Sequence, residues 1–213
     1  MEERKMNDSM QTKKCNKTIE YYNKNAKQYV KDTVDASMFE IRRLFLLKLK
    51  PEGTILDLGC GAGRDSKAFL ESGYKVVMVD GSKELCQIAS EFTGEAAICS
   101  SFQEYEPNRF FDGIWACSSL LHLDKKDLRN AIIKYSKHLS EGGQFYMSFK
   151  YGTFNGERNG RFFTDMDEDN MQKLMDDIPG LLLRERFITN DVRPGRGNER
   201  WINVIYEKEG VNR

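Results

Sequence analysis

Ile-Leu-Asp-Leu-Gly-Cys-Gly-Ala-Gly-Arg-Asp, residues 55–65, is the stretch of this 213-residue chain that decides the fold. An apolar, β-prone run enters a glycine-rich turn, and a helix-prone run follows the turn. Because glycine has no Cβ and accepts positive φ, such a turn lets a ligand approach the backbone closely. In an open parallel sheet this corner lies at the carboxyl ends of the strands, where ligands bind.

The chain around this corner alternates between expected strands and expected helices. Strands are expected over residues 54–58, 74–79, 96–99, 111–117, 144–149, 182–189 and 201–206, and helices over 19–30, 38–49, 64–71, 83–92, 125–139 and 167–175. This alternation predicts a doubly wound α/β fold, with a mostly parallel seven-stranded sheet and helices on both faces. No expected helix separates the last two strands, and the turn-rich link over residues 190–198 predicts an antiparallel last strand.

Composition excludes several classes of protein. The 33 Lys and Arg residues balance 33 Asp and Glu residues, and a formal net charge of 0 disfavours a nucleic-acid binder. We expect no membrane partner, because no apolar run approaches the roughly 18 residues of a membrane helix. Residues 1–5 are not followed by the apolar segment of a secretory signal. Five cysteines without paired spacing predict reduced thiols and a cytoplasmic protein.

The spacing of the glycines separates two classes of ligand. A dinucleotide turn follows the pattern G-x-G-x-x-G, which seats a pyrophosphate on the helix N-terminus. Here the third glycine is Gly63, and Arg64 stands at the expected last position. Asp57, two residues before the first glycine, would repel a diphosphate and attract a ligand with an ammonium or sulfonium centre. Asp80 ends the adjacent strand, where an acid can accept both ribose hydroxyls of an adenosine group.

Residues 57–63, followed by Asp80-Gly81-Ser82, resemble the class I S-adenosylmethionine-dependent methyltransferases. Residues 191–203 are similar to small bacterial members, and residues 63–66 are similar to the tellurite-resistance-type branch. The resemblance implies a seven-stranded sheet with one reversed strand. It also implies S-adenosylmethionine as cofactor and S-adenosylhomocysteine as product. We accordingly expect a disordered tail over 1–15, an N-terminal helical cap over 16–50 and a Rossmann-like methyltransferase domain over 51–213.

The resemblance also implies which residues hold the cofactor. The expected binding residues of the sheet edge are Asp57, Gly59, Cys60, Gly61, Arg64, Asp80, Gly81, Ser82, Ser101, Phe102, Cys117 and Ser118. Family members often carry an acid near the adenine, where this chain has Ser100-Ser101. Tyr22 and Tyr29 lie seven residues apart on one face of the first expected helix and are expected to cap the cofactor. A plain core role for these tyrosines is the alternative.

His122 is the candidate catalytic residue. It follows the fourth strand, in a loop that faces the transferred methyl group in this fold, and histidine is a general base near physiological pH. A packing or capping histidine is the alternative. No metal is expected, because the spacings of the candidate oxygen ligands do not converge.

Three cations are candidate contacts of the acceptor. Lys150 ends the fifth strand, and Arg193 and Arg196 lie in the link between the last two strands. All three would suit an anionic substrate such as a carboxylate or a phosphate. Ordinary surface charges balanced by nearby acids are the alternative.

The sequence therefore predicts an enzyme that transfers a methyl group from S-adenosylmethionine to an O, N or S atom of a small molecule, with an anionic acceptor as one option. The alternatives are a methyltransferase acting on tRNA or protein, a non-catalytic adenosylmethionine-binding protein and a nucleotide-cofactor oxidoreductase. The acceptor and the oligomeric state are left open.

Overall fold

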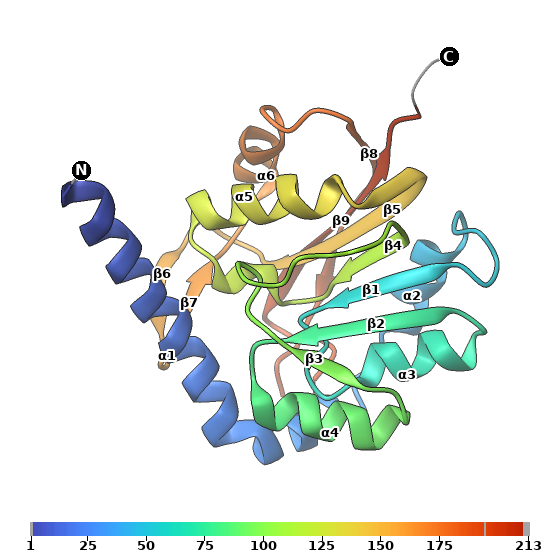
Figure 1. Cartoon of the computed structure of the whole chain (residues 1–213), viewed down its shortest axis with the longest axis horizontal. Helices are drawn as coiled ribbons and strands as arrows, with labels where there is room; N and C mark the ends of the chain where they lie inside the picture. The colour runs from blue at the N-terminus through green and yellow to red at the C-terminus, as the bar shows by residue number, and fades with distance from the viewer. Residues whose placement is uncertain (1, 194, 211–213) are drawn as a thin grey trace.

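The computed structural model describes residues 2–193 and 195–210, and side chains from residue 17 onward within those ranges. Its centre is a seven-stranded sheet in the order β3-β2-β1-β4-β5-β9-β8 (Figure 1). The strands of the sheet are β1 Thr54–Leu58, β2 Lys75–Asp80, β3 Ala97–Cys99, β4 Phe111–Ala116, β5 Leu139–Lys150, β8 Leu181–Asn190 and β9 Arg200–Lys208. Strands β1 to β5 pair in parallel, and β9 runs antiparallel to both β5 and β8. The predicted α/β sheet with one reversed strand is confirmed.

Helices cover both faces of this sheet. They are α2 Phe39–Leu46, α3 Arg64–Glu71, α4 Lys83–Thr93, α5 Lys125–Ser136 and α6 Glu168–Met175, with a short 3-10 helix η1 at Leu120–His122. On one face, Phe45 of α2 and Phe69 of α3 lie against Trp115 of β4, with ring centroids 5.1 and 5.3 Å apart. On the other face, Ile132 of α5 packs into the cluster that holds Leu56 of β1. Each buried side chain of this size stabilises the fold by about 1.5–3 kcal/mol.

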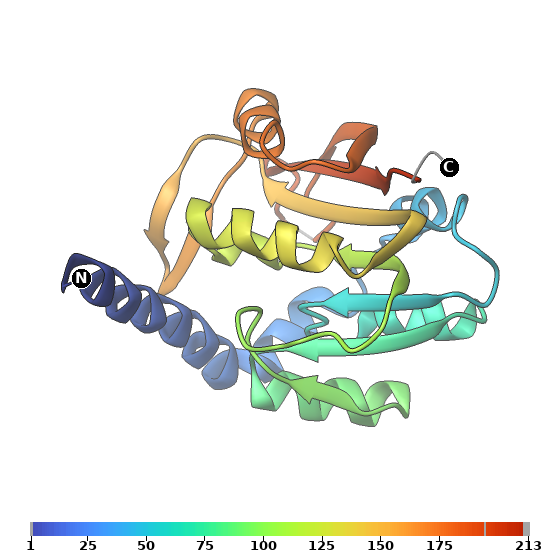
Figure 2. The ribbon, with the colours of Figure 1, turned by 45° about the horizontal axis from the view of Figure 1, so that its top comes forward.

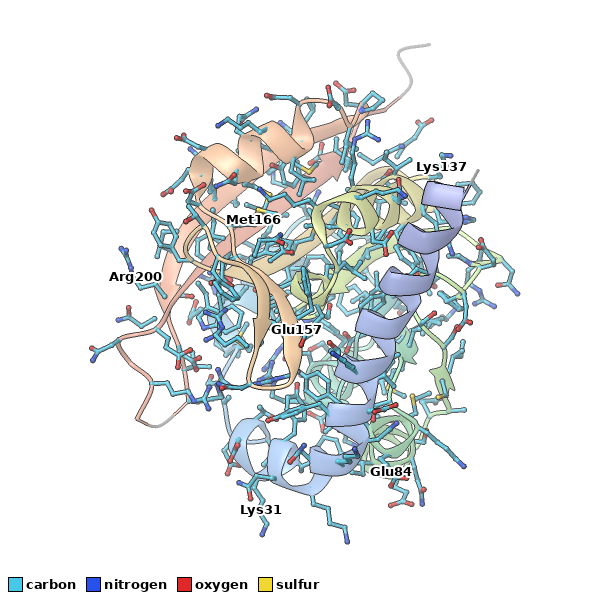
Figure 3. All side chains as sticks on the ribbon, turned by 90° about the vertical axis from the view of Figure 1, so that its left-hand side faces the viewer. Lys31, Glu84, Lys137, Glu157, Met166 and Arg200 are labelled. Atoms are coloured by element: carbon cyan, nitrogen blue, oxygen red, sulfur yellow. The ribbon has the colours of Figure 1, made fainter. Side chains whose placement is uncertain are left out.

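Helix α1, Glu2–Thr33, lies across the edge of the sheet at which β1 and β2 end (Figures 1 and 2). Asn23 Oδ1 accepts a hydrogen bond from Ser82 Oγ at 2.7 Å, which ties α1 to the N-terminus of α4. Thr18 Oγ1 accepts from the backbone N–H of Phe162 at 3.2 Å, which ties α1 to a β-hairpin. This hairpin, β6 Asn155–Arg158 with β7 Arg161–Thr164, lies beside α1 (Figure 3).

Two segments differ from the expectations. Helix α1 begins at Glu2, so the helix includes the expected tail apart from Met1, which lies outside the described residues. The chain has no glycine or proline before residue 51 and many lysines and glutamates, which favour helix. Residues 155–158, where no strand is expected, form β6. Asn159 and Gly160 have φ of 52° and 77°, which suits a two-residue hairpin turn.

Two sequence-based expectations about residue chemistry can be compared with the structure. The four cysteines with described side chains are free thiols. Ser82 is the N-cap of α4, and its Oγ accepts from Leu85 N at 3.2 Å, which is the usual role of a serine at this position. Among the described residues, no helix combines the length and the apolarity needed to cross a membrane.

Candidate functional site

The glycine turn after β1 is held open by backbone geometry. Gly59, Gly61 and Gly63 have φ of 85°, 55° and 82°, which residues with a Cβ rarely adopt. The backbone N–H groups of Gly59 and Cys60 both donate to the carbonyl of Val79 in β2, at 2.8 and 3.0 Å. A Cβ on Gly59 would lie 2.3 Å from Ser119 Cβ. The turn therefore needs glycine both for its conformation and for its closeness to the segment after β4.

Asp80 lies at the end of β2 and closes the same corner. Its Oδ2 accepts from Gly61 N at 2.9 Å, and its Oδ1 accepts from Ser82 N at 2.8 Å. Burial raises the pKa of the Asp80 carboxyl, and the two N–H donors oppose that shift. Since each carboxylate oxygen has two lone pairs, one on each oxygen is left for a ligand hydroxyl.

Two cavities adjoin this corner. The first, called here the corner cavity, has a volume of about 70 Å³, and its walls include Gly59, Gly61, Asp80, Gly81, Ser82, Ser101 and Phe102. The second, called here the outer cavity, has a volume of about 550 Å³, and its walls include Arg64, Lys150, Arg158, Arg161, Arg193 and Arg196. Five residues line both cavities: Tyr22, Tyr29, Cys117, Ser118 and His122. The cavities therefore meet between α1 and the segment after β4.

Tyr22 and His122 form a hydrogen-bonded pair at this junction. The His122 Nδ1 atom lies 2.7 Å from the carbonyl oxygen of Phe162, and Nε2 lies 2.8 Å from Tyr22 Oη. A carbonyl only accepts, so we assign the ring proton to Nδ1 and let Nε2 accept from the tyrosine hydroxyl. Burial, together with the positive charge of Arg161, lowers the pKa of His122 to about 4. The imidazole is therefore neutral at physiological pH.

Most of the predicted cofactor residues lie together around the corner cavity. Its walls contain Gly59, Gly61, Asp80, Gly81, Ser82, Ser101, Phe102, Cys117, Ser118, Tyr22 and Tyr29. Tyr29 lies over the glycine turn, since its Oη would be 3.0 Å from a Cβ on Gly61. The predicted tyrosine face is thus turned toward the corner.

Three of the predicted cofactor residues do not line the corner cavity. Asp57 is buried behind the turn and accepts from Ser66 Oγ at 2.5 Å. Burial, with the charge of Asp65, raises the pKa of Asp57 to about 7. The thiol of Cys60 is also buried, and burial raises its pKa. Arg64 points instead to the outer cavity. Asp57 and Cys60 are therefore buried beside the turn, whereas Arg64 lines the outer cavity.

The three predicted acceptor cations lie together in the wall of the outer cavity, and each faces an acid. Lys150 is ion-paired with Glu199, and Arg196 lies 3.7 Å from the same carboxylate. Arg193 Nε donates to Asp191 Oδ1 at 2.9 Å. The cations therefore face a cavity, as the anionic-substrate hypothesis requires, and each of them contacts an acid, as the surface-charge alternative requires.

Sequence reasoning missed two features of the outer cavity. Arg158 and Arg161 come from the β6–β7 hairpin, and without a predicted hairpin no pattern placed them at the site. Asp65 is a buried hub that accepts from Arg42 Nη1 at 2.6 Å, Arg64 Nη2 at 2.7 Å and Trp115 Nε1 at 3.1 Å. Burial alone would raise the pKa of Asp65, but the two arginines outweigh it and hold the pKa below its usual value.

Metal ligation finds no support in this region. Within the residues whose side chains the structure describes, no group of three or more His, Cys, Asp and Glu side chains is arranged to hold a metal ion.

Comparison with known sequences identifies the domain. Residues 55–143 match the family described as "Methyltransferase domain". An uncharacterized methyltransferase of Anoxybacillus flavithermus is 28% identical over 141 residues, which cover 62% of this chain and 66% of the relative. An uncharacterized methyltransferase of Bacillus subtilis is 27% identical over 138 residues, which cover 61% of this chain and 54% of the relative. The chain thus matches less than two thirds of the length of either relative.

Comparison with solved structures shows the same fold. The 1,6-didemethyltoxoflavin-N1-methyltransferase of Burkholderia thailandensis superposes with a TM-score of 0.69 at 19% identity, covering 90% of this chain and 85% of that one. TehB of Haemophilus influenzae gives 0.68 at 16% identity, covering 85% and 66%. The matched methyltransferase domain over residues 55–143 and the shared fold agree with the resemblance of the glycine corner to the class I, Rossmann-like S-adenosylmethionine-dependent methyltransferases.

Proposed function

We propose that this protein is an enzyme that transfers a methyl group from S-adenosylmethionine to a small-molecule acceptor and releases S-adenosylhomocysteine. The observation that carries the proposal is that the corner cavity and the outer cavity share five wall residues. A donor bound at the glycine turn would face an acceptor in the outer cavity across that junction. Methyl transfer needs this alignment, and well-oriented reactants can account for roughly 7–11 kcal/mol of a barrier.

The side chains and glycines in the walls of the corner cavity suit the recognition of an adenosyl group. Asp80 would accept the ribose hydroxyls on its remaining lone pairs, with Gly81 and Ser82 beside the ribose and adenine. Ser101 and Phe102 would contact the adenine. The Burkholderia thailandensis neighbour was solved with S-adenosylhomocysteine bound, which supports this class of ligand.

The turn and the junction would hold the rest of the cofactor. Gly59 and Gly61 would let the methionine part approach the backbone, while Cys117 and Ser118 would offer backbone groups to it. Tyr22 and Tyr29 would close the cavity from α1. Asp57, Cys60 and Arg64 would contribute to cofactor binding indirectly, by shaping the turn that holds the cofactor. Asp57 would also favour a cationic ligand once its carboxyl is ionised.

The chemistry divides between the cofactor and the chain. S-adenosylmethionine supplies a methyl group activated by sulfonium, so that a bond from the acceptor atom to carbon forms as the carbon–sulfur bond breaks and its electron pair passes to sulfur. The protein aligns the reactants and excludes water at a junction walled by Tyr22, Tyr29 and His122. Where the acceptor has a proton to lose, Tyr22 Oη would take it while passing its own proton to His122 Nε2, which gives His122 its proposed role as base.

The outer cavity favours a small acceptor. Its volume of about 550 Å³ lies in the range of small-molecule sites. A balanced formal charge supplies no general attraction for tRNA. The Burkholderia thailandensis neighbour holds the small molecule 1,6-didemethyltoxoflavin, which agrees with this class of acceptor. Lys150, Arg193 and Arg196 are proposed to contact the acceptor from the side of β5 and β9.

Calorimetry with S-adenosylhomocysteine tests the cofactor assignment. Asp80→Ala should weaken binding by about 1–3 kcal/mol, the scale of hydrogen bonds to a charged group. Asp80→Asn keeps the side-chain shape and should weaken binding less. Glu71→Ala, an exposed acid at the end of α3, is the control and should leave binding unchanged. Binding of NADH in place of S-adenosylhomocysteine, or equal affinity in Asp80→Ala, would overturn the proposal.

A further inference from the structure

Six cationic side chains line the outer cavity, and five of them have a carboxylate partner. The pairs are Arg64–Asp65, Lys150–Glu199, Arg158–Asp165, Arg193–Asp191 and Arg196–Glu199. Arg161 has no ion-pair partner among the residues whose side chains the structure describes. Lys150 and Arg196 share the single carboxylate of Glu199, whereas Arg161 contacts no acid at all among the described side chains.

Aromatic rings, not acids, surround the Arg161 guanidinium. Its central carbon lies 4.3 Å from the ring centroid of Tyr21, 5.1 Å from that of Phe163 and 5.6 Å from that of Tyr22. Nη1 donates to Tyr22 Oη at 3.3 Å. Rings hold a guanidinium in place through cation–π attraction without neutralising its charge. The site thus keeps a fixed cation that is available to a ligand.

Arg161 also has an unsatisfied donor. Its Nε is the sole buried side-chain nitrogen or oxygen without a hydrogen-bond partner in the part of the chain whose side chains are described. An unmet buried donor destabilises a fold, so native proteins keep few of them, and mostly where a ligand, a water or a function accounts for them. An arginine kept at this cost is better explained by binding than by stability.

Arg158, on the same hairpin, can be compared directly with Arg161. Arg158 pairs directly with Arg161 across the β6–β7 turn, and its guanidinium carbon lies 4.6 Å from the same Phe163 ring. Arg158 Nη2, however, donates to both oxygens of Asp165, at 2.8 and 3.1 Å. Two arginines of one hairpin therefore share a ring, and only one of them has its charge met by the protein.

We propose that Arg161 is the specificity-determining anchor for an oxyanion on the acceptor, a carboxylate or a phosphate group. This inference rests on the proposed methyl transfer. A guanidinium presents a rigid fork of donors that suits the two oxygens of such a group, and a site with little water strengthens the contact. The anchor is Arg161, whereas each of the three cations on the side of β5 and β9 already contacts an acid.

The position of Arg161 adds a constraint on the acceptor. Its Nη1 contacts Tyr22, and Tyr22 lines both cavities. An acid group held there lies beside the junction at which the methyl group would be transferred. The acceptor must therefore carry its nucleophilic atom within a few bonds of its acid group.

Binding of simple anions tests the anchor. Benzoate and phenyl phosphate, with benzamide as the neutral match, are titrated by NMR into the full chain saturated with S-adenosylhomocysteine. We expect at least one anion to bind more tightly than benzamide, and the tighter anion identifies the acid class. Arg161→Gln should weaken that binding by about tenfold or more, and Arg161→Lys should weaken it less because the charge stays while the fork is lost. Arg158→Gln, the paired arginine, is the control and should change it less than about threefold.

The same samples separate the two proposals. S-adenosylhomocysteine affinity is measured first for the wild type and for each variant, and failure of the wild type to bind it would overturn the proposed function. If the cofactor product binds but neither anion binds better than benzamide, the role of Arg161 is overturned and the methyltransferase proposal stands. The role is equally overturned if Arg161→Gln binds the anions as well as the wild type, or if Arg158→Gln weakens them as much.

Discussion

The corner cavity and the outer cavity are neighbours built in different ways. The corner cavity is shaped by backbone groups of one short turn and by Asp80, which hydrogen-bonds to that turn. The outer cavity is shaped by charged and aromatic side chains that come from α1, α3, β5, the β6–β7 hairpin and the link between β8 and β9. The difference teaches that the site for a common donor can be encoded locally, whereas the site for a particular acceptor depends on long-range packing.

The largest expected effect is in the turn. Gly59→Ala places a Cβ 2.3 Å from Ser119 Cβ at a φ of 85°, so that steric overlap adds to backbone strain. We expect a loss of about 3 kcal/mol or more in the free energy of unfolding, measured with urea. Gly73→Ala is a matched control with the same φ of 85° and no atom within 4 Å. It should cost about 1–2 kcal/mol. Equal losses in the two variants would show that the contact between position 59 and Ser119 does not affect the free energy of unfolding.

The next largest effect concerns the wall of the outer cavity. Asp65→Asn leaves Arg42 and Arg64 without their buried carboxylate and should destabilise the protein by about 2–4 kcal/mol at pH 7. Because the pKa of Asp65 is lowered in the folded state, its stabilisation is present above the ordinary Asp pKa and is lost as the pH falls through the folded value. The difference in urea unfolding between wild type and variant should therefore shrink in acid. Glu40→Gln, which breaks the exposed pair with Arg43, is the control and should cost under about 1 kcal/mol. A pH-independent difference would contradict the charge argument.

The last expected effect is a pH dependence of opposite sign in the corner. Burial raises the pKa of Asp57 to about 7. Between the ordinary value near 4 and about 7, the unfolded chain has lost this proton and the folded chain has kept it, so this group makes stability fall as the pH rises. Its slope is at most about 1.4 kcal/mol per pH unit. Asp57→Asn should remove this component from the pH profile measured without ligand. A profile for Asp57→Asn that matches the wild type would show that Asp57 ionises normally.

The sheet could be predicted because its signals are local. Apolar runs such as the one entering Asp57, the glycine turn and the Ser82 cap each act within a few residues, and the structure has the strands and the reversed β9 where they were expected. The β6–β7 hairpin escaped prediction. Its strands are four residues each and gain stability from docking on α1, which no local pattern reveals.

The candidate site was predictable to the same extent. Residues attached to the glycine turn or to strand ends lie at the corner cavity, because the topology alone places them there. The direction of the Asp57 side chain was not predictable, since it depends on which side of β1 receives α3 and its Ser66. Arg161 and Asp65 gain their roles from contacts with residues 139 and 50 positions away, Tyr22 and Trp115. The roles proposed for the site residues, His122 included, stay predictions.

Helix α1 forms a wall of both cavities through Tyr22 and Tyr29. Cleavage of the chain just after Thr33, followed by loss of α1, would open the corner cavity and the outer cavity together. For the same reason, a substitution in this helix that changes the choice of acceptor would also change the binding of the donor. New substrate preferences are more easily acquired on the opposite rim, in the hairpin and the link before β9, where a change leaves the donor compartment intact.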